Sequence, residues 1–373
     1  MKRFGFILLM LLPVVGLASK QGFGTEGFSD LFANSLSISQ TEYLQRDVPL
    51  VILDIDLGSS TDDLFALQML CRYADESKCK ILGVICDRVG ENNGMMADLM
   101  LNYYGHPEVP VGVERNSPKA NCFIDYCTEV GDSSILMHYQ AMGYKVTSIP
   151  EERPDGWVLY RRLLSQAPDN SVDIVCLGFM TTLSHLMNSK PDTISSLSGV
   201  ELVERKVKKI YVMGSKLTAV SLDGKIGYNL GNPNSLFADT VFRLLPETIE
   251  VEFSPSQVGK YIGRYEDDSV LHDIADHRNP IYQVYKNFTV DSGQYMWDVL
   301  PVIQCVEGDG LFRMSERGRV RVIFDGVDGK NDRLVFVPDR SGHVRFQYIP
   351  FGWTASDRVR FRNEVLGRIR SSY

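Results

Sequence analysis

Short runs of β-branched and other apolar residues alternate with helix-length stretches along most of this 373-residue chain. This alternation constrains the fold more than any other feature. The predicted strands span residues 50–54, 80–86, 172–177, 207–213 and 249–253. The predicted helices span residues 62–74, 94–105, 155–165, 182–188 and 235–245. The pattern predicts an α/β fold with a mostly parallel, open twisted sheet that helices cover on both faces. Ligands of such sheets bind beyond the carboxyl ends of the strands, so functional residues are expected there.

The C-terminal part of the chain has a different pattern. Closely spaced strand-like runs at 320–324, 334–337 and 344–348 are separated by Gly and Asp turns, which predicts a small antiparallel extension. An arginine-rich amphipathic helix is expected over 358–370. No internal repeat or low-complexity linker interrupts the sequence, so residues 47–373 are predicted to form a single domain.

The N-terminus has the pattern of a secretory signal. Met1-Lys2-Arg3 precedes an almost uninterrupted apolar run over 4–17, with small residues near Ala18. We therefore expect a signal peptide over 1–18, a polar leader over 19–46, and a protein that is exported to the periplasm or secreted. No later segment approaches the roughly 20 apolar residues that cross a bilayer, so no membrane span is expected.

Charge narrows the choice of partners. The formal net charge is −8, and no long basic run is present. Nucleic acid is therefore not expected as a partner, because neutralising phosphates requires clustered Lys and Arg. The expected partner is a small molecule, and a homo-oligomer is left open.

Four carboxylates follow the first predicted strand within ten residues: Asp54, Asp56, Asp62 and Asp63. Negative charges this close repel strongly in a low-dielectric crevice unless a cation or protons offset them. Helix capping would explain Asp62 or Asp63, but it would not explain the two acids at the strand exit. The ligands are all oxygen, which favours Ca²⁺ or Mg²⁺ over zinc.

Two enzyme families share an acidic strand exit. In haloacid dehalogenase-like phosphatases, Asp54 would be the nucleophile and Asp56 the acid/base, but that family does not need a second acid pair six residues later. The segment from Asp54 to Leu67 more closely resembles the signature of the inosine-uridine preferring nucleoside hydrolases, which reads Asp-x-Asp-x-Gly and then Asp-Asp-Ala-x-Ala-Leu. Ser60 stands where longer-loop members carry an acid, and Leu64 replaces the usual Ala.

Later segments resemble the same family in the same order. The segment from Gly178 to Thr182 is similar to the family's Gly-Pro-Leu-Thr-Asn, with Thr182 in place of the Asn, and Ser215 ends a Met-Gly-Ser segment where the family has Met-Gly-Gly. Asn229 matches the family's sugar-binding Asn, but Gly227 occupies the position of its Glu. Asp298 is similar to the family's last metal ligand. The resemblance covers about residues 48–325.

The resemblance implies a calcium ion held by Asp56, Asp63, Asp298 and the backbone carbonyl of Thr181. By the family's mechanism, Asp56 would also be the general base toward a calcium-bound water. The N-glycosidic bond of a ribonucleoside or related ribosyl compound would then be hydrolysed, as in purine or pyrimidine salvage.

The resemblance further implies that Asp62 binds the 2′ hydroxyl, that Asn229 contacts the sugar, and that Trp297, which replaces a His of many relatives, stacks on the leaving base. His272-Asp273 is a rival for the last metal ligand, because it reproduces the family's His-Asp pair literally. A calcium-stabilised binding protein without catalysis is a further alternative.

Overall fold

The computed structural model describes residues 48–58, 60–120, 125–127, 134–147, 152–288, 293–325 and 331–373. Residues Val48–Tyr373 form one compact unit. The predicted signal peptide and polar leader lie outside the described residues. Among the described helices, none is both long and apolar enough to cross a membrane.

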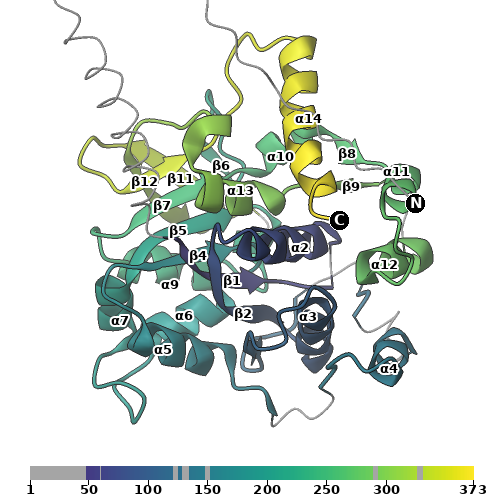
Figure 1. Ribbon diagram of the computed structural model, residues 1–373. Helices are drawn as coiled ribbons and strands as arrows, with labels where there is room; N and C mark the ends of the chain where they lie inside the picture. Colours follow the sequence, from purple (N-terminus) through teal and green to yellow (C-terminus); the bar gives the residue numbers. More distant parts are fainter. Residues whose placement is uncertain are drawn as a thin grey trace, which may run out of the picture. The chain divides into compact units, whose positions relative to one another are not determined.

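A ten-stranded sheet runs through this unit in the order β3-β2-β1-β4-β5-β7-β12-β10-β11-β6 (Figure 1). Seven neighbouring strands, from β3 to β12 in this order, are parallel. They are β1 (Leu50–Ile55), β2 (Lys80–Val89), β3 (Val111–Glu114), β4 (Val172–Cys176), β5 (Val207–Met213), β7 (Glu250–Ser254) and β12 (Val344–Phe346). The predicted mostly parallel sheet is confirmed.

The remaining three strands of the sheet are antiparallel: β10 (Gly318–Ile323), β11 (Arg333–Pro338) and β6 (Asp223–Lys225). Strands β10 and β11 confirm two runs of the predicted extension. The third predicted run, 344–348, contains β12, which is antiparallel to β10 but parallel to β7. The sequence pattern missed β3, which has four residues, and β6, which has three. It also missed a separate two-stranded sheet of β8 (Arg264–Tyr265) and β9 (Gln294–Tyr295), because strands this short carry no periodicity.

Helices cover both faces of the sheet (Figure 1). One face packs on α2 (Asp62–Asp75), α3 (Glu91–Tyr103) and α13 (Val299–Glu307), and α14 (Ala355–Arg370) packs on α2. The other packs on α5 (Gly156–Gln166), α6 (Thr181–Asn188), α7 (Gly199–Lys206) and α9 (Leu236–Leu244). The remaining helices are α4 (Ser134–Ala141), α8 (Tyr228–Gly231), α10 (Ser256–Ile262), α11 (Asp267–Asp273), α12 (Pro280–Phe288) and the 3-10 turn η2 (Asp309–Leu311).

The side chains of β1 show why both faces need cover. Val51, Leu53 and Ile55 join one core cluster and Ile52 joins the other, and all four are fully buried. Alternate residues of a strand point to opposite faces, so a continuous apolar run must be buried on both.

The amphipathic helix that the sequence predicts over 358–370 is also confirmed, because α14 buries Phe361 on its apolar face.

The strand order places a topological switch beside β1. From β1 the chain proceeds to β2 and β3 on one side, and later to β4, β5 and β7 on the other. The loops that leave β1 and β4 therefore diverge, and a crevice opens between them at the carboxyl edge. This edge is where the acidic segment after β1 lies.

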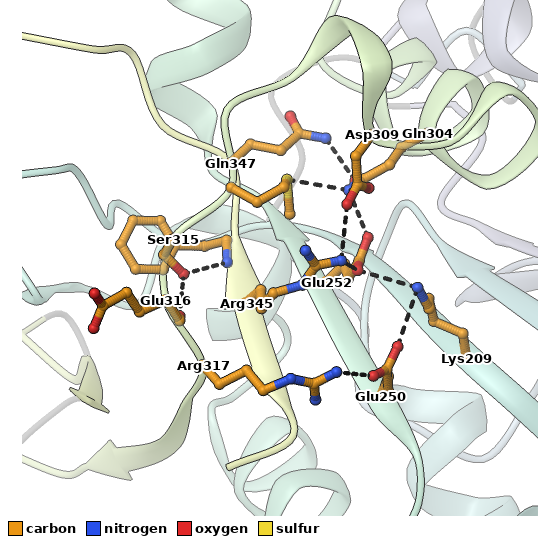
Figure 2. Close-up of polar contacts among 12 residues, drawn as sticks. Lys209, Glu250, Glu252, Gln304, Asp309, Ser315, Glu316, Arg317, Arg345 and Gln347 are labelled. Atoms are coloured by element: carbon orange, nitrogen blue, oxygen red, sulfur yellow. Dashed lines mark hydrogen bonds and ion pairs between the residues drawn. The ribbon is translucent and has the colours of Figure 1, made fainter. Parts of the chain in front are cut away.

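A polar network joins strands β5, β7 and β12 to α13 (Figure 2). Glu252 of β7 is 1% exposed and forms ion pairs with Lys209 of β5, at 3.1 Å, and with Arg345 of β12. Its other carboxylate oxygen accepts a hydrogen bond from Gln304 of α13, at 2.5 Å. The Glu252 carboxylate thus binds polar side chains from three segments that are far apart in the sequence.

The Glu252→Gln variant is expected to lower the free energy of unfolding by about 1–3 kcal/mol, because Lys209 and Arg345 lose their most buried counter-ion and keep only Glu250 and Asp309. Urea denaturation measures this loss. Glu250→Gln is the matched control, since Glu250 is two residues away on β7 and 34% exposed. Its loss is expected to stay below about 1 kcal/mol. Equal losses for the two variants would contradict the role of Glu252.

Candidate active site

Six buried carboxyl groups gather at the carboxyl edge of the sheet. Each belongs to a residue that is at most 4% exposed. They are Asp54, Asp56, Asp62, Asp63, Asp87 and Asp298. Asp54 is the penultimate residue of β1, Asp56 directly follows this strand, and Asp62 and Asp63 are the first two residues of α2. Asp298 is the N-cap of α13, so chain segments more than 200 residues apart meet here.

Carboxylate oxygens of Asp62, Asp63 and Asp298 lie within 4.8 Å of one another, which is a spacing that can hold a metal ion. Both side-chain oxygens of Asp63 are buried without a hydrogen-bond partner. Burial, followed by the charges of Asp56 and Asp62, raises the pKa of Asp63 well above its usual range. Burial and the same kind of repulsion raise the pKa of Asp298. Such oxygens need a proton or a cation.

Asp62 differs from its neighbours because donors surround its carboxylate. One oxygen accepts the backbone N–H groups of Trp297, at 2.9 Å, and of Asp298, at 3.2 Å. The other accepts hydrogen bonds from the Ser60 hydroxyl and the Gln294 amide. Burial raises the pKa of Asp62 to about 6, although these hydrogen bonds oppose the rise. Asp62 therefore ties the start of α2 to the start of α13 and fixes the position of Asp298.

Asp87 was missed by the sequence analysis, although an acid within the apolar run of β2 was a readable signal. Its side chain is 0% exposed, and neither carboxylate oxygen has a hydrogen-bond partner. Burial and the charges of Asp54 and Asp56 raise its pKa well above the usual range. Gly178, after β4, makes this proximity feasible. A Cβ there would lie 2.6 Å from the Asp56 Cβ and from an Asp87 oxygen.

Asp54 lies away from the cavity described below. It is fully buried, and one of its oxygens accepts a hydrogen bond from the Tyr160 hydroxyl at 2.6 Å. Burial raises the pKa of Asp54 to about 7. A nucleophile of a phosphatase must reach its substrate, so this location does not favour the phosphatase alternative.

A cavity of about 550 Å³ opens above the acidic cluster. Its lining includes Asp56, Asp62 and Asp298 from the cluster, together with Asn229 and Trp297. The volume lies within the range of small-molecule sites. The structure therefore brings these five sequence-predicted residues to one cavity, with Asp63 buried next to them.

Two of the cavity residues are held by the backbone around them. The Asn229 amide donates a hydrogen bond to the Leu177 carbonyl. The Trp297 indole N–H donates to the Ser256 carbonyl at 3.0 Å, and the ring packs so closely on Gly259 that a Cβ there would come within 2.2 Å of it. The indole is consequently a fixed part of the cavity wall.

Thr181 is the first residue of α6 and is 1% exposed. Its hydroxyl donates a hydrogen bond to the backbone carbonyl of Asp87, which links the loops after β4 and β2. The predicted role of its carbonyl as a metal ligand stays a prediction.

The rival acid, Asp273, lies on α11 and binds the Tyr265 hydroxyl and Arg370. Its neighbour His272 has a side chain that is 88% exposed. Neither residue lines the cavity, whereas Asp298 joins the acidic cluster.

At two positions where this chain departs from the family pattern, the backbone has a positive φ angle. Gly227 has φ +92°, which favours glycine over the Glu that relatives carry there. Ser215 has φ +75°, in the left-handed region where the family has glycine. The loop after β5 thus keeps a conformation typical of glycine at Ser215, and Gly227 contributes no carboxylate to the cavity.

Comparison with known proteins adds an independent observation. The family model of the inosine-uridine preferring nucleoside hydrolases matches residues 51–333, which is most of the chain. The chain belongs to this family. No curated protein matches it.

Solved structures show the same fold at low sequence identity. A purine-preferring ribonucleoside hydrolase from Gardnerella vaginalis is 16% identical, with a TM-score of 0.54, and the match covers 86% of this chain and 98% of that one. An inosine-guanosine nucleoside hydrolase is 13% identical, with a TM-score of 0.57, over 87% and 99%. The type III effector protein XopQ, complexed with adenosine diphosphate ribose, is 14% identical, with a TM-score of 0.56, over 91% and 97%.

The repulsion at Asp87 leads to a prediction about stability without metal. In the presence of a chelator at pH 8, the free energy of unfolding of the Asp87→Asn variant is expected to exceed that of the wild type by about 1–3 kcal/mol, because the substitution removes a buried charge. Since the folded-state pKa of Asp87 is raised, the wild-type protein loses stability as pH rises above about 4, the unfolded value, toward the folded value. The gain should therefore be smaller at pH 5, as urea denaturation at both pH values would show.

Asp98→Asn is the control for this measurement, because Asp98 is also buried but forms an ion pair with Arg153 at 2.5 Å. This variant is expected to be less stable than the wild type. A loss of stability in Asp87→Asn as well would contradict the repulsion at Asp87.

Proposed function

We propose that this protein hydrolyses the N-glycosidic bond of a ribosyl compound at a calcium site formed by Asp56, Asp63, Asp298 and the carbonyl of Thr181. The observation that carries the proposal is the convergence of buried carboxylate oxygens of Asp62, Asp63 and Asp298 to within 4.8 Å of one another, next to a cavity that Asp56 also lines. Membership of the nucleoside hydrolase family supports the reaction class.

The donor set fits a calcium ion. The side chains that converge offer oxygen atoms only, which is the preference of hard cations. Both Asp63 oxygens are buried and lack any hydrogen-bond donor, so a cation would satisfy them. Calcium bound at this place would supply a positive charge that orients water and the two ribose hydroxyls.

The residues of the chain have separate tasks in this proposal. Asp56, which lines the cavity, accepts the proton of the attacking water. Asp62 keeps α13 in place through the backbone N–H groups of Trp297 and Asp298, and its position at the cavity allows it to accept a hydrogen bond from the 2′ hydroxyl. The negative charge of these carboxylates stabilises the oxocarbenium-like state of the sugar as the bond breaks.

The leaving base requires a different part of the cavity. The Trp297 ring lies 5.0 Å from that of Tyr295, and both line the cavity. Aromatic rings provide a stacking surface for a base. The indole N–H cannot protonate the leaving group at neutral pH, and it is already bonded to Ser256. We therefore assign stacking, and not acid catalysis, to Trp297.

The Asp56→Asn variant is expected to reduce kcat for ribosyl hydrolysis at least about 100-fold, because it removes the base. Liquid chromatography of released base measures this rate. Asp273→Asn is the matched control and should retain wild-type activity, since Asp273 lies outside the cavity. Full activity in Asp56→Asn would show that Asp56 is not the base, and loss of activity in Asp273→Asn would favour the rival acid.

Removal of calcium with a chelator is expected to lower the melting temperature by about 5 °C relative to protein at a calcium concentration 100 times the Kd. In Asp63→Asn the calcium-dependent shift should vanish, while the metal-free protein should melt at or above the wild-type value, because a buried repulsive charge is gone. Differential scanning calorimetry gives both numbers. A calcium shift of wild-type size in this variant would exclude Asp63 as a ligand.

A further inference from the structure

Three basic side chains line the same cavity as the acidic cluster: Lys216, Lys260 and Arg264. All three residues are exposed, so their charged groups are at the solvent side of the cavity. Their presence is notable in a chain with a formal net charge of −8. The cavity therefore has negative groups at its floor and positive groups at its mouth.

Separate elements supply these charges. Lys216 follows β5, immediately after the Gly214-Ser215 turn that also lines the cavity. Lys260 lies on α10 one turn after Ser256, and residues at this spacing share a helix face. Arg264 of β8 donates a hydrogen bond to the Gly293 carbonyl, at 3.1 Å, and its guanidinium lies 5.1 Å from the centre of the Tyr295 ring.

The two lysines do not neutralise the acids of the floor. Within the described part of the chain, neither ammonium group forms a hydrogen bond or an ion pair, although Asp56, Asp62 and Asp298 line the same cavity. An anionic group of a ligand at the mouth of the cavity would therefore meet two ammonium groups that no side chain of the described residues neutralises. The same ligand would need neutral polar groups, such as hydroxyls, at the acidic floor.

We propose that the substrate is a ribosyl compound that carries a phosphate group at its 5′ position, bound by Lys216 and Lys260 with Arg264 adding a third positive charge. This inference rests on the proposed function. There, the 2′ and 3′ hydroxyls are at the acidic floor and C1′ carries the leaving base, so the 5′ carbon is the position left for an anionic substituent. Ammonium groups bind phosphate oxygens through charge-assisted hydrogen bonds.

Kinetics with a matched pair of substrates test the proposal. Wild-type protein is expected to have a higher kcat/KM for inosine 5′-monophosphate than for inosine. In the Lys216→Gln/Lys260→Gln double variant, this ratio should fall at least about tenfold, because two charged hydrogen bonds to the phosphate are lost. Lys190→Gln changes a lysine outside the cavity, and its ratio should equal that of the wild type. An unchanged ratio in the double variant would overturn the proposal.

A binding measurement separates this proposal from the proposed function. Calorimetric titration of calcium-loaded protein should show that ribose 5-phosphate binds at least about tenfold more tightly than ribose, and that the double variant loses this preference. If inosine is hydrolysed but the two sugars bind equally, only the phosphate proposal fails. If ribose 5-phosphate is preferred but neither inosine nor its monophosphate is hydrolysed, the hydrolase function fails and the phosphate site remains supported.

Discussion

Repulsion among buried carboxylates is the constraint on which the site depends. Six such groups are gathered at one edge of the sheet, and Asp63 and Asp87 have side-chain oxygens with no hydrogen-bond partner. Burying a charge without a partner costs several kcal/mol, so this arrangement requires protons on some of the carboxyl groups or a compensating cation. The calcium ion that we propose would supply that positive charge.

The scaffold brings these segments together through its strand order. Loops after β1 and β4 diverge at the topological switch, while Gly178 allows Asp56 and Asp87 to approach each other. The third segment, α13, is held from both ends. Asp62 binds the backbone at its start, and Gln304 joins the network around Glu252 (Figure 2). Arg345 of β12 belongs to the same network, although β12 contributes no residue to the cavity.

The sequence predicts the sheet and the acidic loop because both are local patterns. Apolar runs locate β1 and β5 almost to the residue, and the pair Asp62-Asp63 opens α2 as expected. Asp298 needed the family resemblance, since only the fold brings it to residue 63. Lys260 and Arg264 were missed because short elements such as α10 and β8 have no periodicity, and their shared cavity depends on tertiary packing.

Anomalous diffraction from crystals grown with calcium, or with manganese as a substitute, tests the central claim most directly. The account predicts a single strong anomalous peak at the cavity floor, within coordination distance of about 2.3–2.6 Å of oxygens from Asp63, Asp298 and Asp56. A map with no peak among these three side chains at a saturating cation concentration would contradict the account. A peak found only elsewhere on the protein would contradict it as well.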